Sequence, residues 1–167
     1  MEIRYICKTD SRKEISRIYE ESWKCAYKGI IPQSYLDSIP EGRWAEKLDN
    51  PEWNTLVCTV DGKIIGTSSF CKSRFRQYEG FGEIISIYFL PEYIGKGYGA
   101  KLLEYAVSEL EKLGYNKIFL WVLEDNTRAV NFYERFGFIR TTDILNDNIG
   151  GKSLNEICYI YRSPKSF

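Results

Sequence analysis

The sequence predicts an α/β (α+β) fold, in which a mixed sheet of about six to seven strands is flanked by helices on both faces. Three observations predict it. Two β-branched runs are joined by a hairpin turn, a strand, helix, strand, helix, strand series follows, and the segments 83–90 and 117–123 are apolar on both faces, as in strands covered on two sides. The 167 residues are enough for one hydrophobic core, so we expect a single domain over residues 1–167.

The N-terminal third is expected to be mainly helical. Ile3–Cys7 alternates as a short strand, and Asp10 can cap a helix whose apolar residues recur at helical spacing until Gly29. Pro32 then opens a second short helix, and a third helical segment surrounds Trp44–Leu48.

The middle of the chain contains a hairpin and a central strand. Thr55–Val60 and Lys63–Cys71 are joined by Asp61-Gly62, a dipeptide that favours the positive φ angles of a type I′ turn. Glu83–Leu90 is expected to be a central strand, because it is apolar on both faces.

The last third alternates between helices and strands. Gly97–Leu113 carries its apolar residues on one stripe, and Lys117–Leu123 is a buried strand. Asn126 can cap a helix that Gly137 ends. A strand begins at Phe138, and a last strand over 156–162 closes the chain.

Composition excludes several classes of function. The 23 basic and 23 acidic residues cancel, so the chain lacks the positive excess that drives nucleic-acid binding. Histidine is absent from the sequence, which excludes Ser-His-Asp triads, HExxH zinc sites and a histidine general base. The five cysteines are too far apart for a CxxC pair, so we expect reduced thiols and no metal. Without a secretory signal or a membrane-spanning stretch, a cytoplasmic protein with no membrane partner is expected.

A glycine-rich segment separates a predicted strand from a predicted helix, and it reads Gly95-Lys96-Gly97-Tyr98-Gly99-Ala100. The first N–H groups of a helix have no internal acceptor, and glycine lets a phosphate approach them, so a pyrophosphate would fit there. A P-loop is excluded because Ala100-Lys101-Leu102 follows Gly99. The dinucleotide fingerprint GxGxx[GA] is matched and is a rival, with Glu124 or Asp125 as the ribose-binding acid, but that fold would need several more parallel βα units.

A second motif follows, and it reads Asn126-Thr-Arg-Ala129-Val-Asn-Phe132-Tyr133-Glu-Arg-Phe-Gly137-Phe138. With this motif, residues 83–139 resemble the GNAT superfamily of acyl-coenzyme A-dependent N-acyltransferases, whose signature is [QR]xxGx[GA] and then NxxAxxFYxxxGF. The second part is complete, whereas Ile94 occupies the leading Gln or Arg position of the first. The resemblance implies a GNAT fold with acetyl-coenzyme A as cosubstrate, and Ile94 puts one side-chain contact to the pyrophosphate in doubt.

The resemblance also implies where the cosubstrate binds. Backbone N–H groups of the glycine loop would hold the phosphates, and the pantetheine arm would lie along Ile87–Phe89 like an extra strand. The N–H of Phe89 would polarise the thioester carbonyl, which requires the strands 83–90 and 117–123 to splay apart. Asn126 either bonds the pantetheine or caps its helix. The expected cofactor-binding residues are Ile87, Tyr88, Phe89, Gly95, Lys96, Gly97, Tyr98, Gly99, Ala100 and Asn126.

Two residues are expected to move protons. Glu83 begins an otherwise apolar strand, a setting typical of general bases, in a register resembling that of the catalytic glutamate in the histone acetyltransferase branch. The alternative is an exposed carboxylate at the strand start, with an ordered water as the base. Tyr133 lies about two helical turns after Asn126 and is expected to protonate the leaving thiolate, or else it is a core residue.

The expected reaction is acetyl transfer from acetyl-coenzyme A to a primary amine of a small molecule or peptide, by direct attack in a ternary complex. The alternative is a non-catalytic acyl-coenzyme A sensor of the same fold. Trp23, Tyr27 and Tyr35 either wall the amine pocket or pack the helices together. The sequence leaves open which amine is accepted and whether the protein forms a homodimer.

Overall fold

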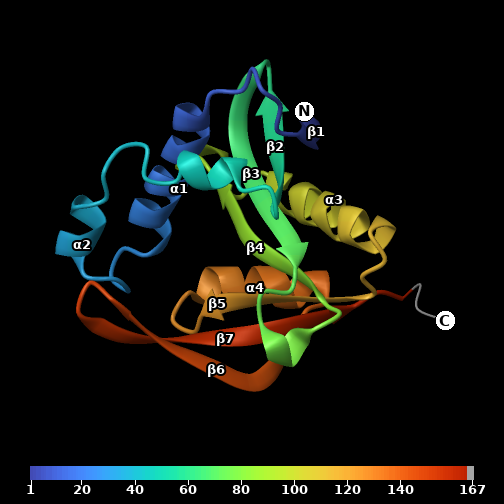
Figure 1. The fold of residues 1–167 in the computed structure, drawn as a ribbon. Helices are drawn as coiled ribbons and strands as arrows, with labels where there is room; N and C mark the ends of the chain where they lie inside the picture. Colours follow the sequence, from blue (N-terminus) through green and yellow to red (C-terminus); the bar gives the residue numbers. More distant parts are fainter. Residues whose placement is uncertain (165–167) are drawn as a thin grey trace.

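The structure is a computed structural model that describes residues 1–164. Seven strands form one sheet in the order β1-β2-β3-β4-β5-β7-β6 (Figure 1). The strands are β1 (Glu2–Tyr5), β2 (Asn54–Val60), β3 (Lys63–Lys72), β4 (Gly82–Phe89), β5 (Lys117–Leu123), β6 (Ile139–Ile149) and β7 (Lys152–Arg162). The α-helices are α1 (Arg12–Ala26), α2 (Gln33–Asp37), α3 (Tyr98–Lys112) and α4 (Thr127–Phe136), and the 3-10 helices are η1 (Glu46–Asp49), η2 (Arg76–Tyr78) and η3 (Pro91–Tyr93).

The sheet is mixed, and β4 is its central strand as predicted. Neighbouring strands pair antiparallel throughout except for β4 and β5, which are parallel and are connected through α3. The predicted fold class is therefore confirmed.

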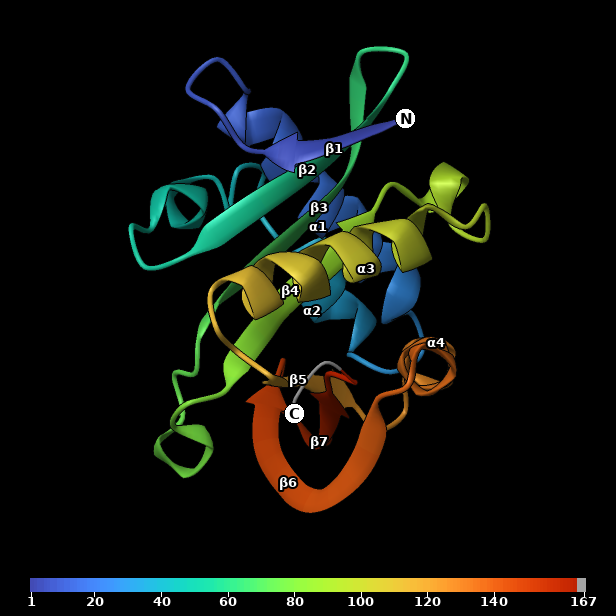
Figure 2. The same cartoon turned by 90° about the vertical axis from the view of Figure 1, so that its right-hand side faces the viewer.

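Helices α1 and α3 cover opposite faces of β3 and β4 (Figure 2). On one face the Tyr19 hydroxyl of α1 lies 3.0 Å from the Ser86 hydroxyl and 3.3 Å from that of Ser69. On the other face Phe70, the residue after Ser69, packs in the same core cluster as Leu103 of α3. Because successive side chains of a strand point to opposite faces, the two helices must lie on different sides of the sheet.

The first helix differs from its prediction at both ends. Ser11 is the N-cap instead of Asp10, and its Oγ accepts a backbone N–H of the first turn at 3.2 Å. Asp10 is unavailable because Arg4 binds both of its carboxylate oxygens at 2.8 Å. The helix ends at Ala26 instead of Gly29, because the chain then turns and the N–H groups of residues 30 and 31 both bond the carbonyl of Tyr27.

One other predicted boundary was wrong, and one predicted helical segment is of the 3-10 type. The last strand begins at Lys152 and not at Glu156, because a polar stretch pairs with β6 in a hairpin at the edge of the sheet, where no apolar pattern is needed. The segment predicted around Trp44–Leu48 forms the short 3-10 helix η1. The turn at Asp61-Gly62 has the predicted positive φ angles, 50° and 76°.

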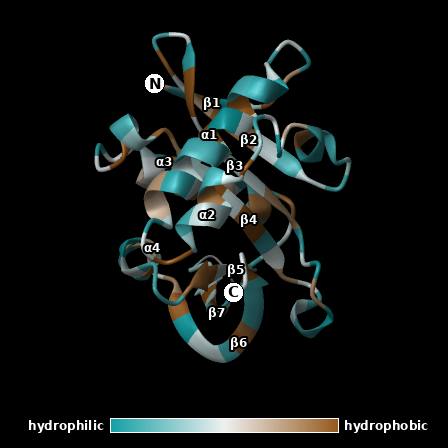
Figure 3. Cartoon of the chain, turned by 90° about the vertical axis from the view of Figure 1, so that its left-hand side faces the viewer, coloured by the Kyte–Doolittle hydropathy of each residue, from teal (hydrophilic) through white to brown (hydrophobic). Residues whose placement is uncertain are grey.

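The main core lies between the sheet and the pair α3 and α4, and it includes Leu102, Leu103 and Tyr133. A second cluster joins α2 to β5 and the β6–β7 hairpin through Leu36, Leu123 and further residues. Figure 3 shows hydrophobic residues along β4, while the outward side of α1 is hydrophilic. Within the described part of the chain, every helix is too short or too polar to cross a membrane.

Candidate active site

The central feature of the site is a gap between β4 and β5. Over residues 1–164, the two strands pair only at Gly82 with Ile118 and at Glu83 with Phe119, and they then diverge. Beyond Glu83, β4 continues to pair with β3 on its other side. The predicted splay is therefore present, and it divides the sheet into β1–β4 and β5-β7-β6 (Figure 1).

Backbone groups of β4 point into this gap. The N–H of Leu90 bonds the carbonyl of Ile65 at 2.9 Å, on the β3 side. Backbone groups of successive strand residues alternate in direction, so the N–H groups of Phe89 and Ile87 face the open side. The carbonyl of Phe89 accepts a hydrogen bond from Ser22 Oγ of α1 at 2.5 Å, which anchors this end of β4 to the helix.

The Phe89 ring at this end of β4 lies so close to β3 that the residue opposite it must be a glycine. Gly66 of β3 lies opposite Phe89, and a Cβ at position 66 would stand only 2.3 Å from the Phe89 ring. The aromatic ring can therefore fold over β3 and lie in the pocket wall.

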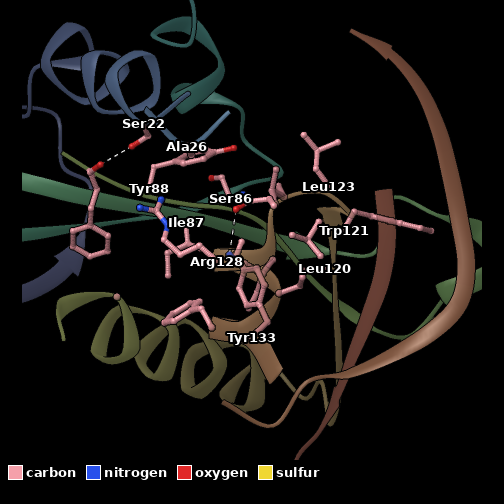
Figure 4. A pocket seen from close by; sticks show the side chains of 18 of the residues that line it. Ser22, Ala26, Ser86, Ile87, Tyr88, Leu120, Trp121, Leu123, Arg128 and Tyr133 are labelled. Carbon is pink, nitrogen blue, oxygen red and sulfur yellow. Dashed lines mark hydrogen bonds between the residues drawn. The ribbon is translucent and has the colours of Figure 1, made fainter. Parts of the chain in front are cut away.

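A pocket of about 730 Å³ fills the gap. It is lined by residues of α1, the β3–β4 loop, β4, the glycine loop, β5, α4 and β7. In Figure 4, Ser22 and Ile87 lie at one end, Trp121 and Leu123 lie at the other, and Tyr133 enters from α4. The predicted site residues that line it are Trp23, Tyr27, Glu83, Ile87, Tyr88, Phe89, Gly95, Gly97, Gly99, Ala100, Asn126 and Tyr133.

Three predicted residues do not line the pocket. The Lys96 ammonium lies 5.2 Å from the centroid of the Tyr93 ring, and the Tyr98 ring also packs on Tyr93, at 6.2 Å. Tyr35 packs beside Gly150 of the β6–β7 turn, and its hydroxyl accepts a hydrogen bond from Arg43 at 3.0 Å. The three side chains therefore do not line the pocket, whereas Gly95, Gly97 and Gly99 of the same loop do.

The glycine loop forms an open turn at the start of α3. Gly95 and Gly97 have φ angles of +81° and +82°, a left-handed conformation that favours glycine, with no atom within 4 Å of where a Cβ would stand. Gly97 is the N-cap of α3 and provides no side-chain acceptor for the first N–H groups of the helix. These free donors and the adjoining pocket fit an anionic phosphate group.

A cluster of tyrosines lines the middle of the pocket. The Tyr88 hydroxyl accepts a hydrogen bond from Trp23 Nε1 at 3.2 Å and lies 3.5 Å from the hydroxyl of Tyr27. Burial, and then the nearby Tyr133 and Glu156, raise the pKa of Tyr27 to about 12, although Tyr88 and Arg128 oppose the shift. Burial followed by the neighbouring Tyr88 raises the pKa of Tyr133 well above its ordinary value. These hydroxyls therefore stay protonated at neutral pH.

Tyr133 is 9% exposed, so its ring is part of the core and its hydroxyl lies at the pocket wall. Among the residues that the structure describes, none forms a hydrogen bond with this hydroxyl. The two roles considered for Tyr133 are therefore compatible, since the ring packs while the hydroxyl can still donate to a bound group.

Glu83 is fully buried and paired. Its two carboxylate oxygens accept from Arg74 Nη2 at 2.6 Å and from Arg74 Nε at 3.1 Å, and the backbone N–H of Arg74 adds a third bond at 3.0 Å. The carboxylate in turn raises the pKa of Arg74. Glu83 is 1% exposed, so the alternative of an exposed carboxylate at the strand start is wrong.

The position of Asn126 is compatible with both roles considered for it, capping α4 and bonding the pantetheine. Its side-chain oxygen accepts the N–H of Ala129 at 3.2 Å, so it caps α4. It also lines the pocket, and it is only 8% exposed. Ile87, along which the pantetheine arm is expected, lines the same pocket.

The pocket also contains residues that were not predicted from the sequence, among them Ser22, Arg74, Arg128 and Glu156. Ser22 is a polar residue on the apolar face of α1, in register with Ile15 and Ile18, and that irregularity was a detectable signal. Glu156 is an acid in a largely apolar strand, the same pattern that singled out Glu83. Arg74 and Arg128 carry no local signal, because a surface arginine is ordinary in a loop or an exposed helix.

The comparisons with known proteins agree with this geometry. The model of the acetyltransferase (GNAT) family matches residues 15–138. The chain is 31% identical over 153 residues to the uncharacterized N-acetyltransferase YuaI of Bacillus subtilis (strain 168), covering 90% of this chain and 87% of the relative. It is 32% identical over 138 residues to an uncharacterized N-acetyltransferase of Archaeoglobus fulgidus, covering 80% and 89%.

Solved structures share the fold at lower identity. The PaiA N-acetyltransferase from Thermoplasma acidophilum, in complex with coenzyme A, superposes with a TM-score of 0.72 at 21% identity and covers 97% of this chain and 99% of that one. The yncA protein of Salmonella typhimurium, solved with its cofactor acetyl-CoA, gives 0.73 at 22%, covering 100% and 96%. The family match and the two relatives above 30% identity together establish that this chain is an acetyltransferase and belongs to the GNAT family.

Proposed function

We propose that the protein transfers an acetyl group from acetyl-coenzyme A to a primary amine of a small molecule or peptide in a ternary complex. The observation that carries this proposal is the free edge of β4, which faces Tyr133 across a pocket that opens at the glycine loop. The five cysteines are free, which fits a cytoplasmic location where thiols stay reduced.

The residues around the gap fit acetyl-coenzyme A, which supplies an activated acetyl thioester when bound. The backbone N–H groups of Gly95, Gly97 and Gly99 would hold its phosphates. Lys96, Tyr98 and Ala100 would contribute their backbone N–H groups and not their side chains. The N–H groups of Ile87 and Phe89 would form hydrogen bonds to the extended pantetheine arm of the cosubstrate, as they would to a neighbouring strand. The Phe89 N–H is our candidate for polarising the thioester carbonyl.

Glu83 is our candidate for taking the proton of the acceptor ammonium. Because it is buried and bound to Arg74, it would act through a water molecule in the pocket instead of touching the amine. Arg74 fixes the position of the carboxylate, and a positioned base contributes about 10²–10⁴-fold to rate.

Tyr133 is our candidate for the acid. Its hydroxyl would donate a proton to the sulfur of the leaving thiolate, and its raised pKa keeps that proton in place through the physiological range. Tyr27 and Tyr88 line the same pocket as Tyr133, so three tyrosine side chains surround the space where the thioester would react.

The test is release of free thiol from acetyl-coenzyme A over a panel of primary amines. The proposal expects thiol release that depends on the amine and forms the acetylated amine in equal amount. Binding of acetyl-coenzyme A without turnover on every amine would instead indicate a sensing module. Failure to bind coenzyme A in calorimetry would contradict the assignment of the cofactor site.

A further inference from the structure

Glu156 is a charged residue of the pocket that the proposed reaction does not use. It lies on β7 opposite Leu123 of β5, so both side chains point to the same face of the sheet and line the same pocket. Its side chain is half-buried. Within residues 1–164, neither a hydrogen bond nor an ion pair engages its carboxylate. A partly desolvated carboxylate without a partner is costly, which points to a bound cation.

Two charged groups on neighbouring elements, Asp147 and Arg74, act on Glu156. Asp147 of the neighbouring strand β6 is exposed and lies two residues after Leu145, the residue that pairs with Glu156. Arg74 approaches from the β3–β4 loop, but its guanidinium already forms an ion pair with Glu83 at 2.6 Å. Burial and then Asp147 raise the pKa of Glu156, with Arg74 opposing. Within the described residues, Glu156 therefore has no cation of its own.

The position of Glu156 separates it from the reacting centre. Tyr27 lines the same pocket as Tyr133 and Glu156, and both of them influence its ionisation. Leu123, which pairs with Glu156, stands at the end of the pocket away from Ile87 (Figure 4). An acceptor that reaches Tyr133 can therefore extend toward Glu156.

We propose that Glu156 binds a second positive charge of the acceptor, so that the preferred acceptor is an aliphatic diamine whose one amine reacts while the other pairs with Glu156. This inference rests on the proposed function and names its substrate class. The flexible apolar chain of such an amine would pass between Tyr27 and Leu123. Asp147, exposed on the neighbouring strand β6, adds attraction for the incoming cation.

Two arginines of α4, Arg128 and Arg135, also line the pocket, and Arg128 defines the competing outcome. Arg128 enters from α4, and among the described residues it has neither an ion-pair nor a hydrogen-bond partner (Figure 4). An acceptor with an amine and a carboxylate could use Arg128 and Glu156 together. A diamine, a monoamine and an amino acid with the same chain length therefore discriminate between these possibilities.

The experiment compares 1,5-diaminopentane, 1-aminopentane and 5-aminopentanoate with wild-type protein and Glu156→Gln. Binding to the coenzyme A complex is measured by calorimetry, and kcat and KM are measured where turnover occurs. We expect the diamine to bind best to the wild type, and its affinity to fall about 10- to 10²-fold in Glu156→Gln, as for loss of one charge-assisted contact. The monoamine should bind both proteins alike. Glu104→Gln, which removes an exposed carboxylate of α3 outside the pocket, is the matched control.

Equal diamine affinity in wild type and Glu156→Gln, or a preference of the wild type for 5-aminopentanoate, would overturn the inference. Because binding is measured without turnover, a chain that binds the diamine through Glu156 but acetylates no amine would contradict the proposed function alone.

Thermal unfolding shows whether the Glu156→Gln variant is folded. Since burial raises the pKa of Glu156, the ionised carboxylate destabilises the native state, so Glu156→Gln should unfold at a higher temperature than wild type at pH 7 to 8. That gain should disappear when the pH falls below 4.5, the ordinary pKa of a glutamate, where the carboxyl is protonated in both states.

Discussion

Replacing Gly99 by alanine is expected to stabilise the fold and to weaken coenzyme A binding. Gly99 is the second residue of α3, and a Cβ there would lie 3.5 Å from the ring of Phe132 and 4.0 Å from that of Phe89, which is ordinary contact. Alanine in a helix is more stable than glycine by about 0.5–1 kcal/mol. For a chain of this size, that corresponds to a rise of about 1–4 °C in the unfolding midpoint.

The added methyl group would also hinder the binding of coenzyme A. Both rings that it meets line the pocket, so the Cβ points into the space next to the first N–H groups of α3. If a phosphate can no longer reach one of these donors, a charge-assisted hydrogen bond worth about 1.5–3 kcal/mol is lost. Affinity for coenzyme A should then fall about 10- to 10²-fold.

Calorimetry with coenzyme A and thermal unfolding measure the two effects separately. Gly97→Ala is the companion variant, because its φ of +82° costs an alanine about 1–2 kcal/mol, so it should lose both stability and affinity. Glu104→Ala, exposed on the same helix, should keep wild-type affinity. Gly99→Ala with unchanged coenzyme A binding would refute the placement of the phosphate site, and binding of NAD in place of coenzyme A would support the dinucleotide alternative.

Further predictions concern the proton-transfer residues. Glu83→Gln should lower turnover about 10²–10⁴-fold with little change in coenzyme A affinity, and near-wild-type turnover from pH 6 to 9 would show that the proton leaves by another route. Tyr133→Phe should lower turnover on the order of 10- to 10²-fold and leave stability nearly unchanged, because the ring still packs. Since burial raises the pKa of Tyr133, wild-type activity should persist up to pH 10 and decline only above it, a decline that Tyr133→Phe should lack. If Tyr133→Phe has the turnover of the wild type and the same decline of activity at alkaline pH, Tyr133 has a packing role only.

The parts of the fold that could be predicted are those with local signals. Asn126 and Gly137 bound α4 as predicted, because a side-chain cap and a left-handed glycine act within a few residues. The cap at Asp10 was wrong because Arg4, outside the helix, takes both carboxylate oxygens. Local propensity cannot report such a competing partner.

The same limit applies to the candidate site. The glycine loop and Tyr133 were identified from two short motifs, each contiguous in the sequence, and both line one pocket as the family resemblance implies. That Arg74 would bind Glu83 depends on how the β3–β4 loop folds back, and no spacing in the sequence encodes it. Glu156 shows the opposite case, since its pattern was visible but its position in the pocket depends on the pairing of β7 with β5.

The gap between β4 and β5 also bears on how the protein avoids aggregation. An unpaired strand edge is a template on which other chains can add, and this sheet has two such edges inside the molecule. They are reached only through a pocket walled by α1 and α4, where Ser22 already occupies the carbonyl of Phe89. A folded partner could not bring a strand of its own into that space, whereas a slender, flexible chain could. The same enclosure that admits an extended ligand thus protects two reactive edges from neighbouring molecules.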